Sequence, residues 1–181
     1  GFRQQVNSTP TTITGVTIGG VTAAQIVVRS LISESNADNH TEIWSAAVPS
    51  GTTADVVITL SATVARLAVS VFKVTGASTS ASDTDGISEA TTGGGVQAVT
   101  LAVPANGGVI GFSFFRGPSS GSASVVTTNF TEDYQVNSES TTNFASGHQN
   151  EASGGDITYT FTWTGTPIQG SVACWAAWGP A

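Results

Sequence analysis

Charge is scarce in this sequence of 181 residues. Only 9% of the residues are charged, and twelve acidic against five basic side chains give a formal net charge of −7, whereas a typical globular protein has about 25% charged residues. Nucleic acids are bound by clustered cations that displace counterions from phosphates. The cations here are scattered along the chain, at Arg3, Arg29, Arg66, Lys73 and Arg116. We therefore expect neither nucleic acid nor an anionic membrane surface as a partner.

Cysteine and histidine are almost absent. The single cysteine, Cys174, excludes an internal disulfide, and its apolar surroundings in the sequence predict a buried thiol. Together with the two histidines, His40 and His148, it is too little for a structural zinc site. His148 lies near Glu151 and Asp156, which would suit a base with an orienting acid, but no Gly-x-Ser-x-Gly elbow supplies a nucleophile. We expect no enzyme activity.

Acidic residues form few groups that could hold a metal or cleave a sugar. Residues 83–86 resemble the start of a calcium loop, but an EF-hand needs Glu at position 12, where this chain has Gly94. A looser calcium site at this loop stays open as an alternative. Glycoside hydrolysis needs two carboxylates across a cleft, and pairs such as Glu132 with Asp133 read more simply as solvated turns. We predict no metal and no cofactor.

Helical periodicity is also missing, and no apolar run approaches the roughly 20 residues of a membrane-spanning helix. Short runs rich in β-branched residues alternate instead with turns of Gly, Ser, Thr and Asn. Residues 157–163 alternate apolar side chains with threonines, and residues 171–178 are apolar on both faces, which predicts an inner strand. We predict an all-β fold, a two-sheet antiparallel β-sandwich of jelly-roll-like topology, with an up-and-down barrel as the alternative.

Other segments predict the remaining strands. Gly19 and Gly20 suit a two-residue hairpin turn. Residues 66–75 are apolar on both faces and predict a central strand, whereas residues 77–95 predict a long surface connection. Residues 123–130 and 134–137 are expected to pair with each other. Further strands are predicted at residues 15–18, 21–30, 41–48, 55–60, 96–103, 109–115 and 143–149.

The first 14 residues differ from the rest. They carry spaced apolar side chains, Phe2, Val6 and Ile13, among polar residues, and they predict an N-terminal arm that attaches to a neighbouring molecule. Residues 15–181 are predicted to form a single β-sandwich domain. Tyr134 is the best candidate for an exposed aromatic side chain that faces a ligand such as a glycan, while the four tryptophans fall on predicted strands and are expected in the core.

Several segments taken in order carry a family resemblance. They are VTIGGVTA at residues 16–23, EIW at 42–44, VPSGT at 48–52, VVITL at 56–60, AVSVFKVTG at 68–76 and AAWGPA at 176–181. In this order they resemble a β-sandwich domain of structural proteins in tailed phages and prophages. The resemblance implies a virion component, such as a capsid decoration, head-fibre or tail-associated protein, that works as a homo-oligomer with other virion proteins. A secreted, extracellular carbohydrate-binding or adhesive module is the alternative.

Overall fold

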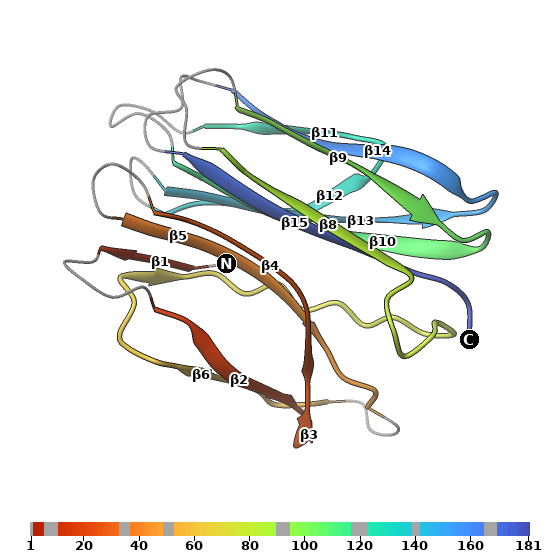
Figure 1. Cartoon of the computed structure of the whole chain (residues 1–181), viewed down its shortest axis with the longest axis horizontal. Helices are drawn as coiled ribbons and strands as arrows, with labels where there is room; N and C mark the ends of the chain where they lie inside the picture. Colours follow the sequence, from red (N-terminus) through yellow and green to blue (C-terminus); the bar gives the residue numbers. More distant parts are fainter. Residues whose placement is uncertain are drawn as a thin grey trace.

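The computed structural model describes residues 2–5, 11–32, 37–48, 53–89, 95–116, 123–138, 142–164 and 170–181. In these residues every regular element is a β-strand, and the strands form four sheets that we number I to IV (Figure 1). Sheet I has the order β11 (Val125–Thr128), β14 (Gly155–Trp163), β9 (Gly95–Val103). Sheet II has the order β12 (Thr131–Ser138), β13 (Thr142–Glu151), β10 (Gly107–Arg116), β15 (Ser171–Trp178), β8 (Asp83–Glu89). Sheet III has the order β4 (Ala24–Ile32), β5 (Ala37–Ser45), β1 (Phe2–Gln5), β7 (Arg66–Leu67), and sheet IV the order β3 (Val21–Thr22), β2 (Ile13–Ile18), β6 (Val56–Leu60).

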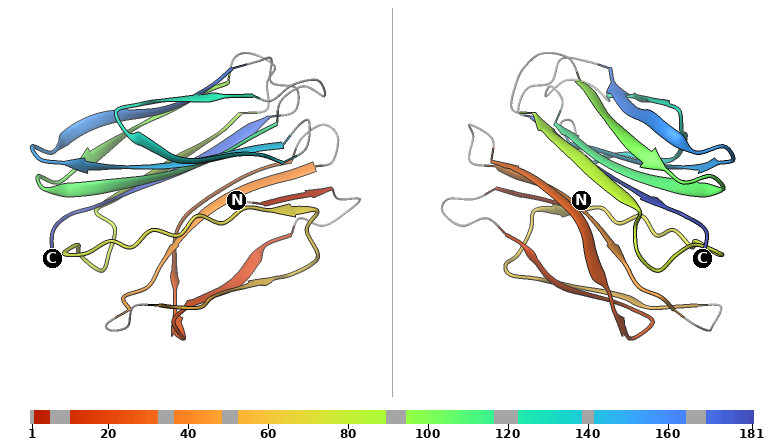
Figure 2. Two further views of the ribbon diagram at one scale, coloured as in Figure 1. Left: turned by 180° about the vertical axis from the view of Figure 1, so that it is seen from behind. Right: turned by 45° about the vertical axis from the view of Figure 1, so that its right-hand side comes forward.

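The sheets are stacked in the order of their numbers, from sheet I at the top of Figure 1 to sheet IV at the bottom. Sheet II is therefore covered on both faces, by sheet I above and by sheet III below (Figures 1 and 2). All strand pairings described are antiparallel. The predicted all-β antiparallel sandwich is confirmed, and it extends to four sheets.

The main core lies between sheets I and II. Tyr159, Phe161 and Trp163 of β14 are buried, whereas the threonines between them are more exposed, so the predicted alternation of this strand is confirmed. Trp163 stacks on Phe115, with ring centroids 5.2 Å apart and planes at 9°. Phe161 packs against Trp175, with ring centroids 5.3 Å apart. Such aromatic pairs add to the stabilisation that the buried apolar area gives.

Strand β15 is buried along its whole length. It pairs with β10 on one side and β8 on the other, so the predicted inner strand is confirmed. One of its faces packs into the main core, and the other, with Cys174, Ala176 and Trp178, packs against Val27 and Ile43 of sheet III. A strand covered on both faces needs apolar residues at consecutive positions, which explains its composition.

Two turns set the path of the chain. Gly19 and Gly20 have φ of 58° and 78°, and the hairpin predicted there joins β2 to β3. Asn129, with φ of 63°, turns the chain from β11 in sheet I to β12 in sheet II. The predicted pairing of residues 123–130 with 134–137 is therefore wrong, because β11 pairs with β14 and β12 with β13.

The prediction of a central strand at residues 66–75 is wrong as well. Only Arg66 and Leu67 pair, as β7, with β1. Beyond them Ala68 packs with Phe112 and Phe144 below sheet II, but no strand pairing involves residues 69–75 within the described part of the chain. Val69, Val71 and Val74 are 47%, 67% and 52% exposed. The face with Ala68 is covered at its start, the face with Val69 and Val71 is not, and at Val74 the cover ends on the first face as well.

Two further segments differ from expectation. Residues 83–89 of the predicted surface connection form β8, which pairs with β15 at the edge of sheet II. Of the predicted arm, residues 2–5 form β1, which lies between β5 and β7 of sheet III, and Ile13 begins β2, where it pairs with Leu60. Val6 lies outside the described residues. Attachment of this segment to a neighbour stays a prediction.

Candidate functional site

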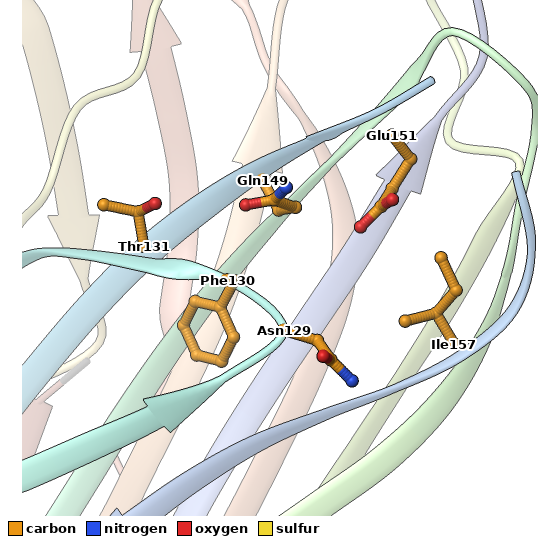
Figure 3. Close-up of a pocket in the computed structure, with 6 residues that line it drawn as sticks. All are labelled: Asn129, Phe130, Thr131, Gln149, Glu151 and Ile157. Carbon is orange, nitrogen blue, oxygen red and sulfur yellow. The ribbon is translucent and has the colours of Figure 1, made fainter. Parts of the chain in front are cut away.

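A polar hollow of about 490 Å³ lies at one end of sheets I and II, beside the turn between β11 and β12. Figure 3 shows the six residues that line it: Asn129, Phe130, Thr131, Gln149, Glu151 and Ile157. The Asn129 amide is already engaged, because its Nδ2 donates to the carbonyl of Thr158 at 2.8 Å. Phe130 is buried and packs edge-on against Phe161, with ring centroids 4.7 Å apart, so its ring face is not offered to a ligand.

Glu151 of this hollow is tied to the core. Its Oε1 accepts a hydrogen bond from the hydroxyl of Tyr159 at 3.1 Å. Burial, together with this bond and the negative charge of Glu151, raises the pKa of Tyr159 well above its ordinary value. Tyr159 therefore stays neutral and acts as a donor. A hydroxyl-rich ligand would meet the second oxygen of Glu151 and the amide of Gln149, whose Nε2 already donates to the carbonyl of Asn150 at 3.2 Å.

Tyr134, the predicted ligand-facing aromatic residue, lies on β12 and is 44% exposed. Strand β12 forms one edge of sheet II. Tyr134 does not line the polar hollow, and the nearby Phe130 is buried. The structure thus presents a single exposed ring here and does not bring the two aromatic residues together as one binding surface.

His148 has an orienting acid, but not the one that its sequence neighbours suggest. Its Nδ1 lies 2.7 Å from Asp133 Oδ2, because an irregularity in the pairing of β12 with β13 falls at Asp133. Glu151 is instead bound to Tyr159. Ser146 and Ser70 share a hydrogen bond of 2.8 Å, and the described residues show no bond from either serine to His148. Among the residues that the structure describes, no nucleophile lies in contact with this pair.

A second acid–histidine pair lies on β5. His40 Nε2 is 2.5 Å from Glu42 Oε1, and Glu42 Oε2 accepts hydrogen bonds from Gln25 Nε2 at 2.8 Å and Trp44 Nε1 at 2.5 Å. Burial of Glu42 acts to raise its pKa, but these hydrogen bonds and the attraction of His40 outweigh it, so the pKa lies below the ordinary 4.5. Glu42 is therefore an ionised, buried carboxylate at neutral pH.

The described part of the chain contains neither a cluster of metal ligands nor a helix that could cross a membrane. No group of three or more His, Cys, Asp or Glu side chains could hold a metal ion there. Asp83, in the segment that resembles a calcium loop, accepts hydrogen bonds from the backbone amides of Thr84 and Ala102, and Asp85 binds Arg29. In the same residues no helix is long and apolar enough to cross a membrane.

Cys174 lies in the core between sheets II and III. The residue is fully buried, and its Sγ lies 3.1 Å from Thr41 Oγ1. Burial raises the pKa of its thiol to about 11, against the smaller opposing effect of the Thr41 hydroxyl. Because the thiolate is the reactive form, this cysteine is inert at neutral pH. The prediction of a buried thiol is confirmed.

A second hollow, larger than the first, lies below sheet II and has a volume of about 630 Å³; we call it the apolar groove. Its upper wall is made by Ile110, Phe112 and Trp178, and its lower wall by apolar residues of β2 and β6. Its sides are the end of β5 and the extended residues 67–75. The apolar residues on both faces of residues 66–75 were the sequence signal for this feature, but they predicted a covered strand rather than the wall of a groove.

Comparison with known proteins gives no match to a family model, to a curated protein or to a solved structure. The resemblance to phage structural proteins thus rests on the sequence segments alone.

Proposed function

We propose that this chain works without catalysis, by assembly with other protein molecules, as a structural component of a phage particle present in several identical copies. The observation that carries the proposal is the apolar groove with its row of exposed valines at residues 69, 71 and 74. Monomeric proteins rarely expose contiguous apolar surface unless a partner covers it. The resemblance of the sequence segments to phage structural proteins is the reason for placing this assembly on a phage particle.

The rest of the surface suits assembly. With only 9% charged residues, an interface between copies desolvates few ions, and burying an ion without a partner costs far more than burying a hydrogen-bonded hydroxyl. The outward threonines of β14 are typical of this surface: Thr158 Oγ1 and Thr100 Oγ1 lie 2.8 Å apart across β14 and β9. Such hydroxyl-rich faces form wet contacts readily.

Light scattering coupled to size-exclusion chromatography tests the assembly. The full chain is expected to form oligomers at micromolar concentration, and replacing Val69 and Val71 together with Lys is expected to shift them to monomers. The matched control replaces Val57 of β6 and Val126 of β11 with Lys; they are 55% and 59% exposed and do not line the groove, so the oligomers should stay intact. A wild-type chain that stays monomeric, and that is missing from the particle fraction of the source culture, would reject the proposal.

A carbohydrate-binding module is the second candidate, and the polar hollow with Glu151 and Gln149 and the exposed Tyr134 are the observations that favour it. A glycan array read with the labelled chain separates the two. Tight binding of one polysaccharide, lost in Tyr134→Ala or Gln149→Ala, together with a monomeric chain, would replace assembly by this function.

A further inference from the structure

The polar hollow presents mainly hydrogen-bond acceptors. The side-chain amide nitrogen of Asn129 already donates to the carbonyl of Thr158 at 2.8 Å, and that of Gln149 donates to the carbonyl of Asn150 at 3.2 Å. These two bonds set the orientation of both amide groups. Within the described residues, the amide oxygens of Asn129 and Gln149 accept no hydrogen bond. A group that enters the hollow therefore meets two oriented carbonyl oxygens with lone pairs to offer.

The carboxylate of Glu151 adds a negative charge to these oxygens. Its side chain is half-buried and extends into the space between the lining residues (Figure 3). Oε1 accepts the hydroxyl of the fully buried Tyr159 at 3.1 Å, so the carboxylate is anchored to the core from one side. Oε2 accepts no hydrogen bond from the described residues. One oxygen of the carboxylate therefore positions it, and the other is available to a ligand.

The strands around the hollow carry negative charge without a basic side chain to balance it. The described strands β11 to β14 contain no Lys or Arg. Their acidic residues are Glu132, Asp133, Glu151 and Asp156. Their one histidine, His148, precedes Gln149 and so lies on the opposite face of β13, where its Nδ1 is 2.7 Å from Asp133 Oδ2. The electrostatic potential in the hollow is therefore negative, which favours a cation and disfavours an anion.

We propose that the polar hollow binds a sugar residue with a free, protonated amino group, such as a residue of a glucosamine polymer. An ammonium group donates three hydrogen bonds and accepts none, which matches Oε2 of Glu151 and the amide oxygens of Asn129 and Gln149. Ile157, which is half-buried, gives an apolar wall for the C–H face of a pyranose ring. The inference rests on the carbohydrate-binding candidate above and names the class of sugar.

Three other classes of ligand fit the hollow less well. A calcium ion takes about six to eight oxygen ligands and usually several carboxylates, whereas Glu151 is the single carboxylate among the lining residues. An acidic sugar would bring a second negative charge next to Glu151. A neutral sugar gains hydrogen bonds but no attraction between opposite charges. A sugar amine uses both the acceptors and the charge.

Isothermal titration calorimetry of the full chain tests the class of ligand. The probes are the trimers of glucosamine and of N-acetylglucosamine at pH 6, which share one backbone and differ in whether the nitrogen is a charged amine or a neutral amide. We expect the glucosamine trimer to bind at least tenfold more tightly. Equal affinities, tighter binding of the acetylated trimer, or no binding of either trimer at millimolar concentration would overturn the proposal.

Matched variants locate the binding. Glu151→Gln keeps the size of the side chain and an acceptor for Tyr159 but removes the charge, so it should weaken binding of the glucosamine trimer at least tenfold. Asp156→Asn removes an exposed charge next to Ile157 that does not line the hollow, and it should change the affinity less than twofold. Equal weakening in both variants would show general attraction to an acidic surface and reject the site.

A second variant separates binding from stability. Gln149→Leu removes one amide oxygen of the hollow and leaves the bond between Tyr159 and Glu151 in place. It should weaken binding of the glucosamine trimer severalfold, with a circular dichroism spectrum like that of the wild type. Wild-type affinity in Gln149→Leu would place the sugar outside the hollow and reject the site.

Calcium chloride alone and a glycan array distinguish the remaining outcomes. A melting temperature that rises in millimolar calcium, and no longer does so in Glu151→Gln, would identify a metal site and overturn the proposal. Binding of only neutral or acidic sugars on the array would keep the carbohydrate-binding function and reject the amine. Binding of the glucosamine trimer that both hollow variants weaken, by a chain that binds no polysaccharide on the array, would keep the site and reject the role as a carbohydrate-binding module.

Discussion

Trp163 shows how much a single side chain in the main core does. It is 3% exposed, stacks on Phe115, and its Nε1 donates to Ser113 Oγ at 2.9 Å and to Gln97 Oε1 at 3.3 Å. Ser113 and Gln97 are fully buried and share a further hydrogen bond of 2.5 Å. Trp163 thus fills volume and also satisfies polar groups that have no access to water.

Replacing Trp163 with Ala is therefore expected to lower the free energy of unfolding by about 3–5 kcal/mol, from the cavity and the lost contacts. Urea denaturation followed by circular dichroism measures it. The neighbouring Thr162→Ala, on the outer face of the same strand, should cost less than about 1 kcal/mol. A Trp163→Ala loss below that of Thr162→Ala would show that the faces of β14 are assigned the wrong way round.

Glu42 makes the stability depend on pH. Its pKa is lowered in the folded chain, so its contribution is present above the ordinary pKa of 4.5 and is lost as the pH falls through the lower folded pKa. Glu42→Gln should cost about 1–3 kcal/mol at pH 7, because it leaves the donors of Gln25 and Trp44 without a charged acceptor. It should also reduce the difference in unfolding free energy between pH 7 and pH 3.

Urea denaturation at the two pH values measures both effects. Glu132→Gln is the control, since burial raises the pKa of Glu132, and this residue therefore adds no stability that acid removes. If Glu42→Gln keeps the full pH dependence of the wild type, the loss of stability in acid comes from other carboxylates.

At the scale of the element, local pattern predicts a strand but not its neighbours. Alternation predicts β14, apolar residues on both faces predict β15, and two consecutive glycines predict the turn at Gly19 and Gly20. All three patterns are properties of consecutive residues. Residues 66–75 have a similar pattern, but Val69 and Val71 are exposed, and periodicity does not tell whether another element covers a face. The partner of His148 was likewise missed, because Asp133 reaches it only through the register of β12 and β13.

The space around the glycines of β10 shows how closely that strand packs against its neighbours. A Cβ at Gly111 would lie 2.7 Å from the indole of the fully buried Trp175, whereas a Cβ at Gly108 would find its nearest neighbour at 3.4 Å. Gly111→Ala should therefore destabilise the chain by about 1–3 kcal/mol through overpacking, and Gly108→Ala, in the same strand, should have little effect. Thermal unfolding of the two variants compares them directly, and equal melting temperatures would contradict the tight contact between β10 and β15.

At the scale of the whole molecule, the two halves of the stack are unequally packed. Sheets I and II enclose a continuous aromatic core, whereas sheets II to IV enclose the apolar groove of about 630 Å³. The lower half therefore loses contacts that a filled interior would supply. The same feature explains why the position of the site could not be predicted: the groove arises from how four sheets stack, and no segment of the sequence carries that information alone.

Hydrogen exchange followed by mass spectrometry should show this inequality directly. In sheets I and II, amides are expected to exchange only through global unfolding, namely those of β9, β10, β13, β14 and β15. In sheet IV, fewer buried contacts hold the strands, so amides of β2, β3 and β6 are expected to exchange through a smaller opening of lower free energy. Uniform protection of all four sheets in the free chain would contradict the unequal packing.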